Sequence, residues 1–284
     1  MKIMIEPNFD KRNAAECTQK VCDQLYGLGA VILVTGETAA RIDVPYASVL
    51  EMESCLKQAD AIIAIGGDGT IIHTAKHAVL YDKPVLGINA GRLGFLAGLE
   101  QNELHLLEKL VCQDYQIDRR MLLEIILRSE EQESRFLAMN DMVVSSGQAH
   151  MVDLDVYCMD RYVISYRADG VVLSTPTGST AYAMSAGGPI VEPNMYSIGL
   201  TPICPHSLFG RTILFGPENI LKLSISNGDT SHPYLIVDGE DGIPMKPTDT
   251  LTVQKSQVQV KLIRLCDKPF YEILNEKFLT RAKQ

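Results

Sequence analysis

The sequence has no run of about 18 apolar residues, the length that a membrane-spanning helix requires. Residues 1–6 are too short and too soon acidic for a signal peptide. The seven cysteines are scattered and form no C-x-x-C pair, which argues against a disulfide framework and against a zinc site of paired thiols. We therefore expect a cytoplasmic protein with reduced thiols and no membrane partner.

The chain also lacks an excess of positive charge. It carries 26 Lys and Arg residues against 35 Asp and Glu residues, a formal net charge of −9. Because nothing in such a chain attracts a polyanion at long range, we do not expect a nucleic acid as a partner. Small anionic substrates stay possible through backbone N–H groups and single arginines.

The 284 residues, 46% of them apolar, are enough for one large or two medium domains. Up to about residue 115, strand-like runs alternate with helical periodicity. The expected strands cover residues 2–6, 31–34, 61–65 and 85–88, and the expected helices cover 10–26, 48–58, 71–80 and 103–111. This alternation is typical of a parallel α/β sheet, in which ligands lie beyond the carboxyl ends of the strands.

From residue 115 to about 265, short β-branched runs broken by Gly, Asp, Asn and Pro predict an antiparallel β domain. Residues 270–282 form a last predicted helix, which could return to the first domain. We therefore expect an α/β domain over residues 1–115, joined by the returning helix 269–284, and a β domain over residues 116–268.

The chain is organised around Ala61–Thr70, which reads A-I-I-A-I-G-G-D-G-T. A buried strand runs into a glycine turn and then a helix, an arrangement whose N-terminal amides favour phosphate. Asp68 would repel a phosphate there, unless it accepts a proton or holds a metal ion. The alternative is that Asp68 merely caps the helix.

Three further segments carry polar groups beside turns. Thr175–Tyr182 packs four hydroxyl residues, a glycine and an aromatic before a short predicted helix, a set that suits a nucleotide. Asn140 and Asp141 stand between two strand-like runs. Asp169 follows Arg167 and precedes Gly170, where it could also be an ordinary turn residue.

The Gly66–Thr70, Asn140–Asp141 and Thr175–Tyr182 segments resemble the three signature motifs of the NAD kinases, which phosphorylate the 2′-hydroxyl of the adenosine ribose of NAD to give NADP. The segments 87–96 and 186–189 also look like family segments, so the resemblance covers most of the chain. It implies a Rossmann-like first domain, a β second domain, a returning last helix, and a homodimer or homotetramer.

The resemblance also implies residue roles. Asp68 would be the catalytic base, and the donor phosphate would lie on Gly66, Gly67, Gly69 and Thr70. The implied NAD contacts are Asp68, Gly69, His73, Asn140, Asp141, His150, Arg167, Asp169, Thr180, Ala181, Tyr182, Ser185 and Glu240, some of them across a subunit boundary. No Walker A lysine follows the glycine turn, so Mg²⁺ or another divalent cation is expected to arrive with the donor, ATP or a polyphosphate.

Several competing motifs are absent. His73 and His77 have the spacing of a two-histidine metal site, but residue 74 is threonine rather than the glutamate of H-E-x-x-H, so no protein-held metal is expected. Ser179 lacks the G-x-S-x-G elbow of a hydrolase.

Two alternatives stay open. A lipid kinase of the diacylglycerol or sphingosine type shares the glycine turn, but it would have no use for the Asn140 and Thr175–Tyr182 segments. A dinucleotide sensor without activity would gain nothing from the Asp68 carboxylate beside phosphates.

Overall fold

The structure, a computed structural model, describes residues 1–11, 13–91, 94–146, 150–207, 210–226 and 233–282, with side chains described up to Lys277 in the last helix. They form two compact units, residues 1–119 with 260–284 and residues 120–259. The sequence placed the boundaries after residues 115 and 268. The observed division falls inside β7 (Gln116–Arg128) and β18 (Thr250–Arg264), because both strands run through the two units.

The first unit is built on a parallel sheet. Its strands are β1 (Lys2–Pro7), β2 (Val31–Val34), β3 (Ser48–Val49), β4 (Ala61–Gly66), β5 (Val85–Asn89) and β6 (Leu99–Glu100). The order is β5-β4-β1-β2-β3 with every pair parallel, and β6 adds to β5. The predicted parallel α/β class is confirmed.

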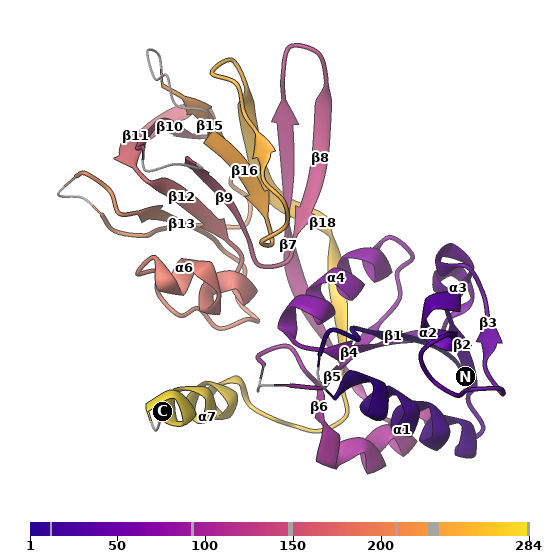
Figure 1. The fold of residues 1–284 in the computed structure, drawn as a ribbon. Coiled ribbons are helices and arrows are strands. Elements are labelled where there is room, and N and C mark those ends of the chain that lie inside the picture. Colours follow the sequence, from indigo (N-terminus) through magenta and orange to yellow (C-terminus); the bar gives the residue numbers. More distant parts are fainter. Residues whose placement is uncertain (12, 92–93, 147–149, 208–209, 227–232, 283–284) are drawn as a thin grey trace. The chain divides into compact units, whose positions relative to one another are not determined.

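Helices cover both faces of this sheet. The helices of this unit are α1 (Ala14–Gly27), α2 (Gly36–Ala39), α3 (Met52–Gln58), α4 (Asp68–Val79), the 3-10 helix η1 (Gln101–Leu106), α5 (Leu107–Val111) and the last helix α7 (Phe270–Ala282). The α1 and α5 helices lie on one face, and α3 and α4 lie on the other (Figure 1). The last helix belongs to the first unit, as predicted.

Side chains of β1 alternate between these two faces. Ile3 and Ile5 are fully buried in the core that also contains Val21 of α1. Met4 and Glu6 therefore point to the opposite face, where α4 lies. This alternation brings one carboxylate of β1 beside the helix that follows the glycine turn.

The second unit consists of two antiparallel sheets. The first contains β7, β8 (Glu133–Ala138), β10 (Val152–Cys158), β11 (Arg161–Ala168), β15 (Leu221–Ile225) and β18. The second has the order β14-β13-β12-β9-β16-β17, with β9 (Asp141–Ser146), β12 (Gly170–Ser174), β13 (Ile198–Ile203), β14 (Ile213–Phe215), β16 (Pro233–Val237) and β17 (Ile243–Pro244). The predicted antiparallel β class is confirmed.

The core of the second unit is made by alternating residues of both sheets. Val152, Leu154 and Val156 of β10 are buried, while the residues between them are partly exposed. The same core includes the buried ring of Tyr166. The 3-10 helix η2 (Thr177–Thr180) and α6 (Tyr182–Ser185) follow β12 and carry the hydroxyl-rich segment.

Two of the predicted helices are divided in the structure. Residues 48–58 contain β3 before the helix, which begins only at Met52, because Val49 pairs with Val34 of β2. Residues 103–111 divide into η1 and α5, and η1 begins with reciprocal side-chain caps from Glu100 and Glu103. Among the described residues, no helix is long and apolar enough to cross a membrane.

Candidate active site

The parallel sheet changes its winding direction between β1 and β4. From β1 the chain proceeds to β2 and β3 on one side, and from β4 it proceeds to β5 on the other. Ligands of open α/β sheets bind outside the carboxyl ends of the strands at such a point. A cavity of about 490 Å³ lies there, lined by residues that include Glu6 of β1, Asn8 just after it, and Gly69, Thr70 and His73 of α4.

The glycine turn connects β4 to α4. Gly66 ends the strand, Gly67 is the N-cap residue, and Asp68 is the first residue of the helix. The alternative in which Asp68 caps the helix is therefore wrong, since no side chain caps α4 and the cap position belongs to Gly67. A Cβ on Gly66 would lie 2.4 Å from Thr70 Oγ1, so this close approach requires glycine.

The Asp68 carboxylate instead faces the second glycine cluster. Its Oδ2 accepts a hydrogen bond from the Phe95 N–H at 2.9 Å, and its Oδ1 accepts one from the Leu96 N–H at 3.0 Å. A Cβ on Gly94 would lie 2.1 Å from Oδ1, so the loop reaches the carboxylate only because residue 94 is glycine. Both glycine clusters of the sequence thus meet at Asp68.

The last helix adds a cation to this site. Lys277 Nζ lies 3.6 Å from Asp68 Oδ2 and 3.8 Å from the centre of the Phe95 ring. The Asp68 side chain still keeps 29% of its surface exposed, so a ligand can reach it. Nothing in the sequence singled out Lys277, because it belongs to no motif and lies more than two hundred residues from the glycine turn.

In the second unit, Thr175 links two of the predicted segments. Its hydroxyl donates to the Met139 carbonyl at 2.6 Å and accepts from the Gly178 N–H at 3.0 Å, while its own N–H donates to the Asn140 carbonyl at 2.8 Å. A Cβ on Gly178 would lie 2.0 Å from that carbonyl oxygen. The structure therefore brings the Asn140 turn and the hydroxyl segment together.

Asp141 is buried between these segments and the turn after β16. Its carboxylate accepts a hydrogen bond from the Tyr182 backbone N–H. Burial, together with the neighbouring Asp238 carboxylate, raises the pKa of Asp141 to about 7, and the Tyr182 N–H opposes the rise. Near neutral pH this carboxyl group can therefore donate or accept a hydrogen bond.

Asp238 was not among the residues predicted from the sequence. Its carboxylate accepts hydrogen bonds from the backbone N–H groups of Met139 at 2.9 Å, Asn140 at 2.7 Å and Asp141 at 3.1 Å. Through these bonds Asp238, whose backbone φ is 49°, holds the whole Asn140 turn in place. The sequence signal that could have found Asp238 is its position between an apolar strand and Gly239. The same kind of pattern marked Asp169, which precedes Gly170.

The hydroxyl segment divides into buried and accessible groups. Ser179 is buried and bonds to the backbone of Pro176 and Val191, so its role is structural. Tyr182, 46% exposed, and Ser185 lie on the surface. Thr180 and Ala181 are half-buried between them.

Three other predicted contacts lie elsewhere in the second unit. In the ladder between β9 and β12, Asp141 pairs with Ser174, whereas Ser145 pairs with Gly170 at the other end. Asp169 lies at that other end, with its carbonyl accepting from the Ser146 N–H. Arg167 faces Asp153 of β10 at 3.9 Å, and His150, whose carbonyl accepts from the Ser146 hydroxyl, is exposed. Four residues of β9 separate Ser145 from Asp141, and a strand rises about 3.3 Å per residue. Asp169 and its neighbours therefore lie about 13 Å or more from Asp141.

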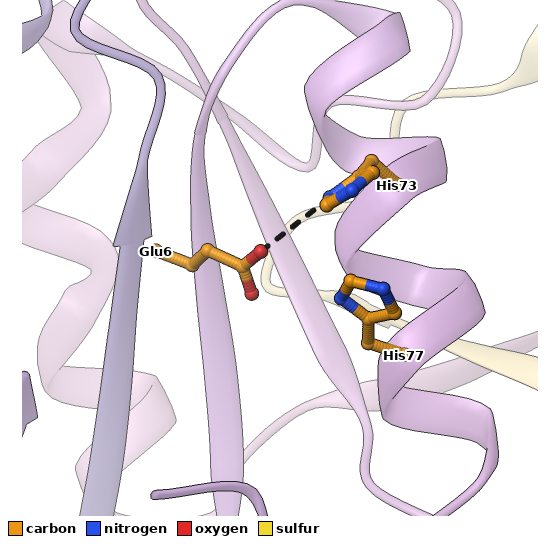
Figure 2. A group of neighbouring side chains, drawn as sticks. All are labelled: Glu6, His73 and His77. Atoms are coloured by element: carbon orange, nitrogen blue, oxygen red, sulfur yellow. Dashed lines mark ion pairs between the residues drawn. The ribbon is translucent and has the colours of Figure 1, made fainter. Parts of the chain in front are cut away.

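Glu240 and His73 complete the predicted set. Glu240 is exposed in the turn that also contains Asp238, with its N–H bonded to the Val237 carbonyl. His73 lies on α4 with its Nδ1 3.6 Å from a Glu6 carboxylate oxygen, and its ring meets the ring of His77 edge-on (Figure 2). His73 thus faces β1 and the wall of the cavity.

The fold and these groups define a protein of two units, a parallel α/β unit with a glycine turn at its switch point and an antiparallel β unit with a buried polar network. Family models match both: residues 3–115 match the ATP-NAD kinase N-terminal domain, and residues 139–265 match the ATP-NAD kinase C-terminal domain. The chain belongs to the NAD kinase family, which confirms the resemblance seen in the sequence.

Individual relatives agree over the full length. The chain is 32% identical to the NAD kinase of Acetivibrio thermocellus, covering 100% of this chain and 99% of the relative. It is 37% identical to the NAD kinase of Heliobacterium modesticaldum, covering 95% of each.

Solved structures show the same fold. Yeast NADH kinase complexed with NADH superposes with a TM-score of 0.86 at 24% identity, covering 97% of this chain and 86% of that one. An NAD kinase from Archaeoglobus fulgidus in complex with ATP gives a TM-score of 0.74 at 23% identity, covering 98% of each.

Proposed function

We propose that this chain transfers a phosphoryl group from ATP, another nucleoside triphosphate or polyphosphate to the 2′-hydroxyl of the adenosine ribose of NAD, giving NADP. The observation that carries the proposal is the placement of Asp68, a partly exposed carboxylate at the first residue of α4, between the two glycine clusters. The family membership supports the same reaction.

The donor phosphates would bind at the N-terminus of α4. Gly66, Gly67, Gly69 and Thr70 surround the helix start, and Gly69 and Thr70 line the cavity at the switch point. Backbone N–H groups and the helix dipole stabilise negative charge there. The Asn8 side chain, which donates to Thr70 Oγ1 at 3.2 Å, fixes the threonine hydroxyl at the cavity wall.

Asp68 would act as the general base. The 2′-hydroxyl gives its proton to the carboxylate while its oxygen forms the new bond to phosphorus, and the bridging oxygen of the donor leaves with its electron pair. The two N–H donors of Phe95 and Leu96 hold the carboxylate in one orientation. Alignment of this kind supplies much of the rate in phosphoryl transfer.

Recognition of the acceptor would fall to the second unit. Asn140 and Asp141 would hold the adenine and ribose of NAD, with Thr180, Ala181, Tyr182 and Ser185 beside them. The Thr175 and Asp238 hydrogen bonds support this role, because they fix the Asn140 turn before any ligand arrives. Glu240 lies in the same turn as Asp238 and would contact the ligand from there.

We further propose that the chain forms a homodimer or homotetramer in which His150, Arg167 and Asp169 serve the NAD bound by another copy. The distance between these residues and Asp141 along the β9–β12 ladder supports this division. Light scattering of purified protein would give the subunit count. Mixed oligomers of the Asp68→Asn and Arg167→Ala variants should regain part of the activity that each lacks alone.

A divalent cation, Mg²⁺ or a similar ion, would come with the donor and neutralise charge on its phosphates. The residues fit this route, because both oxygens of Asp68 already accept backbone hydrogen bonds rather than forming part of a carboxylate cage. We place the enzyme in the cytoplasm, where the seven free thiols would stay reduced.

The proposal is tested by measuring NADP formation from NAD with Mg²⁺ and a panel of donors that includes ATP, other triphosphates and polyphosphate. We expect NADP with at least one donor, and the parallel assay with NADH shows whether the reduced form is accepted. Phosphorylation of diacylglycerol or sphingosine instead would point to a lipid kinase. Tight NAD binding without product from any donor would point to a sensor.

A further inference from the structure

Two histidines and a glutamate converge on the face of the first unit that α4 covers. Figure 2 shows Glu6 reaching from β1 toward His73 and His77 of α4. One ligand atom from each residue lies within 4.8 Å of the others, and Glu6 Oε1 is 3.6 Å from His73 Nδ1. Among the described residues, this is the group of three side chains placed to share one metal ion.

The arrangement follows from the backbone. Residues four apart on a helix lie one above the other on the same face, so α4 presents both imidazoles in one direction. The alternation of β1 directs Glu6 toward them, because its neighbours Ile3 and Ile5 fill the opposite core. A carboxylate and two imidazoles therefore meet although the chain separates Glu6 from His73 by more than sixty residues.

Glu6 is suited to bind a cation. Its side chain is only 13% exposed, and its Oε2 is buried, with the Thr74 hydroxyl as its neighbour. Burying a carboxylate is costly, and a bound cation offsets that cost. His73, in contrast, is 61% exposed and has room to turn its ring.

We propose that Glu6, His73 and His77 form a binding site for a divalent transition-metal ion, and that zinc is the ion which this ligand set fits best. Two imidazoles and one carboxylate leave a fourth tetrahedral position for water. With bonds of about 2.0 to 2.1 Å, tetrahedral ligand atoms lie about 3.3 Å apart, so the ligand atoms, now within 4.8 Å of one another, must approach by up to about 1.5 Å. The exposed His73 ring can supply part of this shift.

This site differs from the one for the donor's Mg²⁺. Imidazole nitrogen suits zinc, cobalt, nickel and copper, whereas Mg²⁺ prefers oxygen ligands and retained water. The sequence argued against a metal because residue 74 is threonine, but the carboxylate comes from β1 instead of from the helix. The proposal does not rest on NAD kinase activity, since the ion would join β1 to α4 whether or not substrate is bound.

The test is equilibrium binding of ZnCl₂ to the tag-free, full-length protein by calorimetry, with Zn²⁺ measured after dialysis. We expect one Zn²⁺ per chain and a rise in Tm on its addition. The His77→Ala and His73→Ala variants should each bind at least about tenfold to a hundredfold more weakly, the effect typical of damaging a metal site. His105→Ala is the matched control, because His105 is an exposed histidine of the same unit outside the cluster.

Two further measurements keep the result decisive. The exposed thiols of Cys112 and Cys204 are competing ligands. If the ion binds to the imidazoles and the carboxylate instead, Co²⁺ spectra should show weak d–d bands without the intense charge-transfer absorption of a thiolate ligand. Circular dichroism must show that the variants are folded. Binding that disappears when the thiols are alkylated, or that His73→Ala and His77→Ala leave as tight as His105→Ala does, would overturn the proposal.

Discussion

The two units hold their key carboxylates in opposite ways. In the first, backbone N–H groups of the Phe95 loop orient Asp68, whose side chain stays 29% exposed. In the second, Asp141 is 5% exposed and lies among side chains and backbone groups that Asp238 and Thr175 fix. In the proposed reaction, the first arrangement would keep a carboxylate accessible to a reacting atom, and the second would provide a rigid surface for recognition.

This difference predicts where each unit is sensitive to mutation. The geometry at Asp68 depends on glycines that allow backbone to approach, so adding a methyl group there should impair chemistry. The geometry at Asp141 depends on buried hydrogen bonds, so removing an acceptor should impair binding and stability together.

The largest effect is expected for Asp68→Asn. The amide keeps the size of the side chain but cannot accept the proton, so turnover should fall by about 10²- to 10⁴-fold. Initial rates of NADP formation at saturating NAD and donor measure this. A variant that keeps more than a tenth of the parent rate would show that Asp68 is not the base.

Gly94→Ala should give the next largest loss. The new Cβ would lie 2.1 Å from Asp68 Oδ1 and must displace the carboxylate or the loop, so we expect turnover to fall about tenfold or more. Gly91→Ala is the matched control in the same loop, because a Cβ on Gly91 would have open space around it, with no atom within 4 Å. Equal rates for the two variants would contradict the role assigned to this close approach.

Asp238→Ala should weaken the second unit. Three backbone N–H groups lose their acceptor, which should lower the free energy of unfolding by about 1 to 3 kcal/mol and weaken NAD binding. Asp238→Asn keeps one acceptor oxygen and should recover part of both. Asp241→Ala changes an exposed acid three residues further along the chain and is the control. Denaturant unfolding with NAD titration checks the prediction, which fails if Asp238→Ala behaves like Asp241→Ala.

Asp141 should make stability depend on pH. Because its pKa is raised from 3.8 to about 7, the folded state binds more protons than the unfolded state between about pH 4 and 7, and stability falls as pH rises through this window. Relative to the parent, Asp141→Asn should remove a slope of at most about 1.4 kcal/mol per pH unit. Unfolding curves across this range measure it, and identical slopes in parent and variant would refute the assignment.

Lys277→Met should have the smallest effect. Methionine keeps an apolar chain over the Phe95 ring but removes the charge 3.6 Å from Asp68. A partly exposed ion pair contributes about 0.2 to 1 kcal/mol, so turnover should change by less than about fivefold. A loss as large as that of Asp68→Asn, measured in the same rate assay, would make Lys277 part of the catalytic group instead.

The sequence predicted the parts of the fold that local pattern determines. The strand before the glycine turn and the last helix were found because apolar periodicity and glycines mark them. The β3 strand was missed, since two residues carry no period and form a strand only by pairing with β2. The same patterns predicted the class of each domain, and the family resemblance agreed with it.

The site was predicted unevenly for a similar reason. Asp68 and Asn140 stand in recognisable motifs, whereas Asp238 acts through backbone groups 97 to 99 residues earlier in the chain. Glu6 likewise meets His73 only because β1 and β4 are neighbours in the sheet. Residues that only the tertiary structure brings together have no characteristic spacing in the sequence, so a sequence pattern does not reveal them.

The central claim is that the first unit performs the chemistry and the second binds NAD. The most direct test is the Kd for NAD of Asp68→Asn and of Asn140→Ala, measured by calorimetry without a phosphate donor. We predict that Asp68→Asn stays within a few fold of the parent, while Asn140→Ala binds at least about tenfold more weakly, a loss of about 1.4 kcal/mol. An Asn140→Ala protein that binds as tightly as the parent, or an Asp68→Asn protein that loses NAD to the same extent, would contradict the claim.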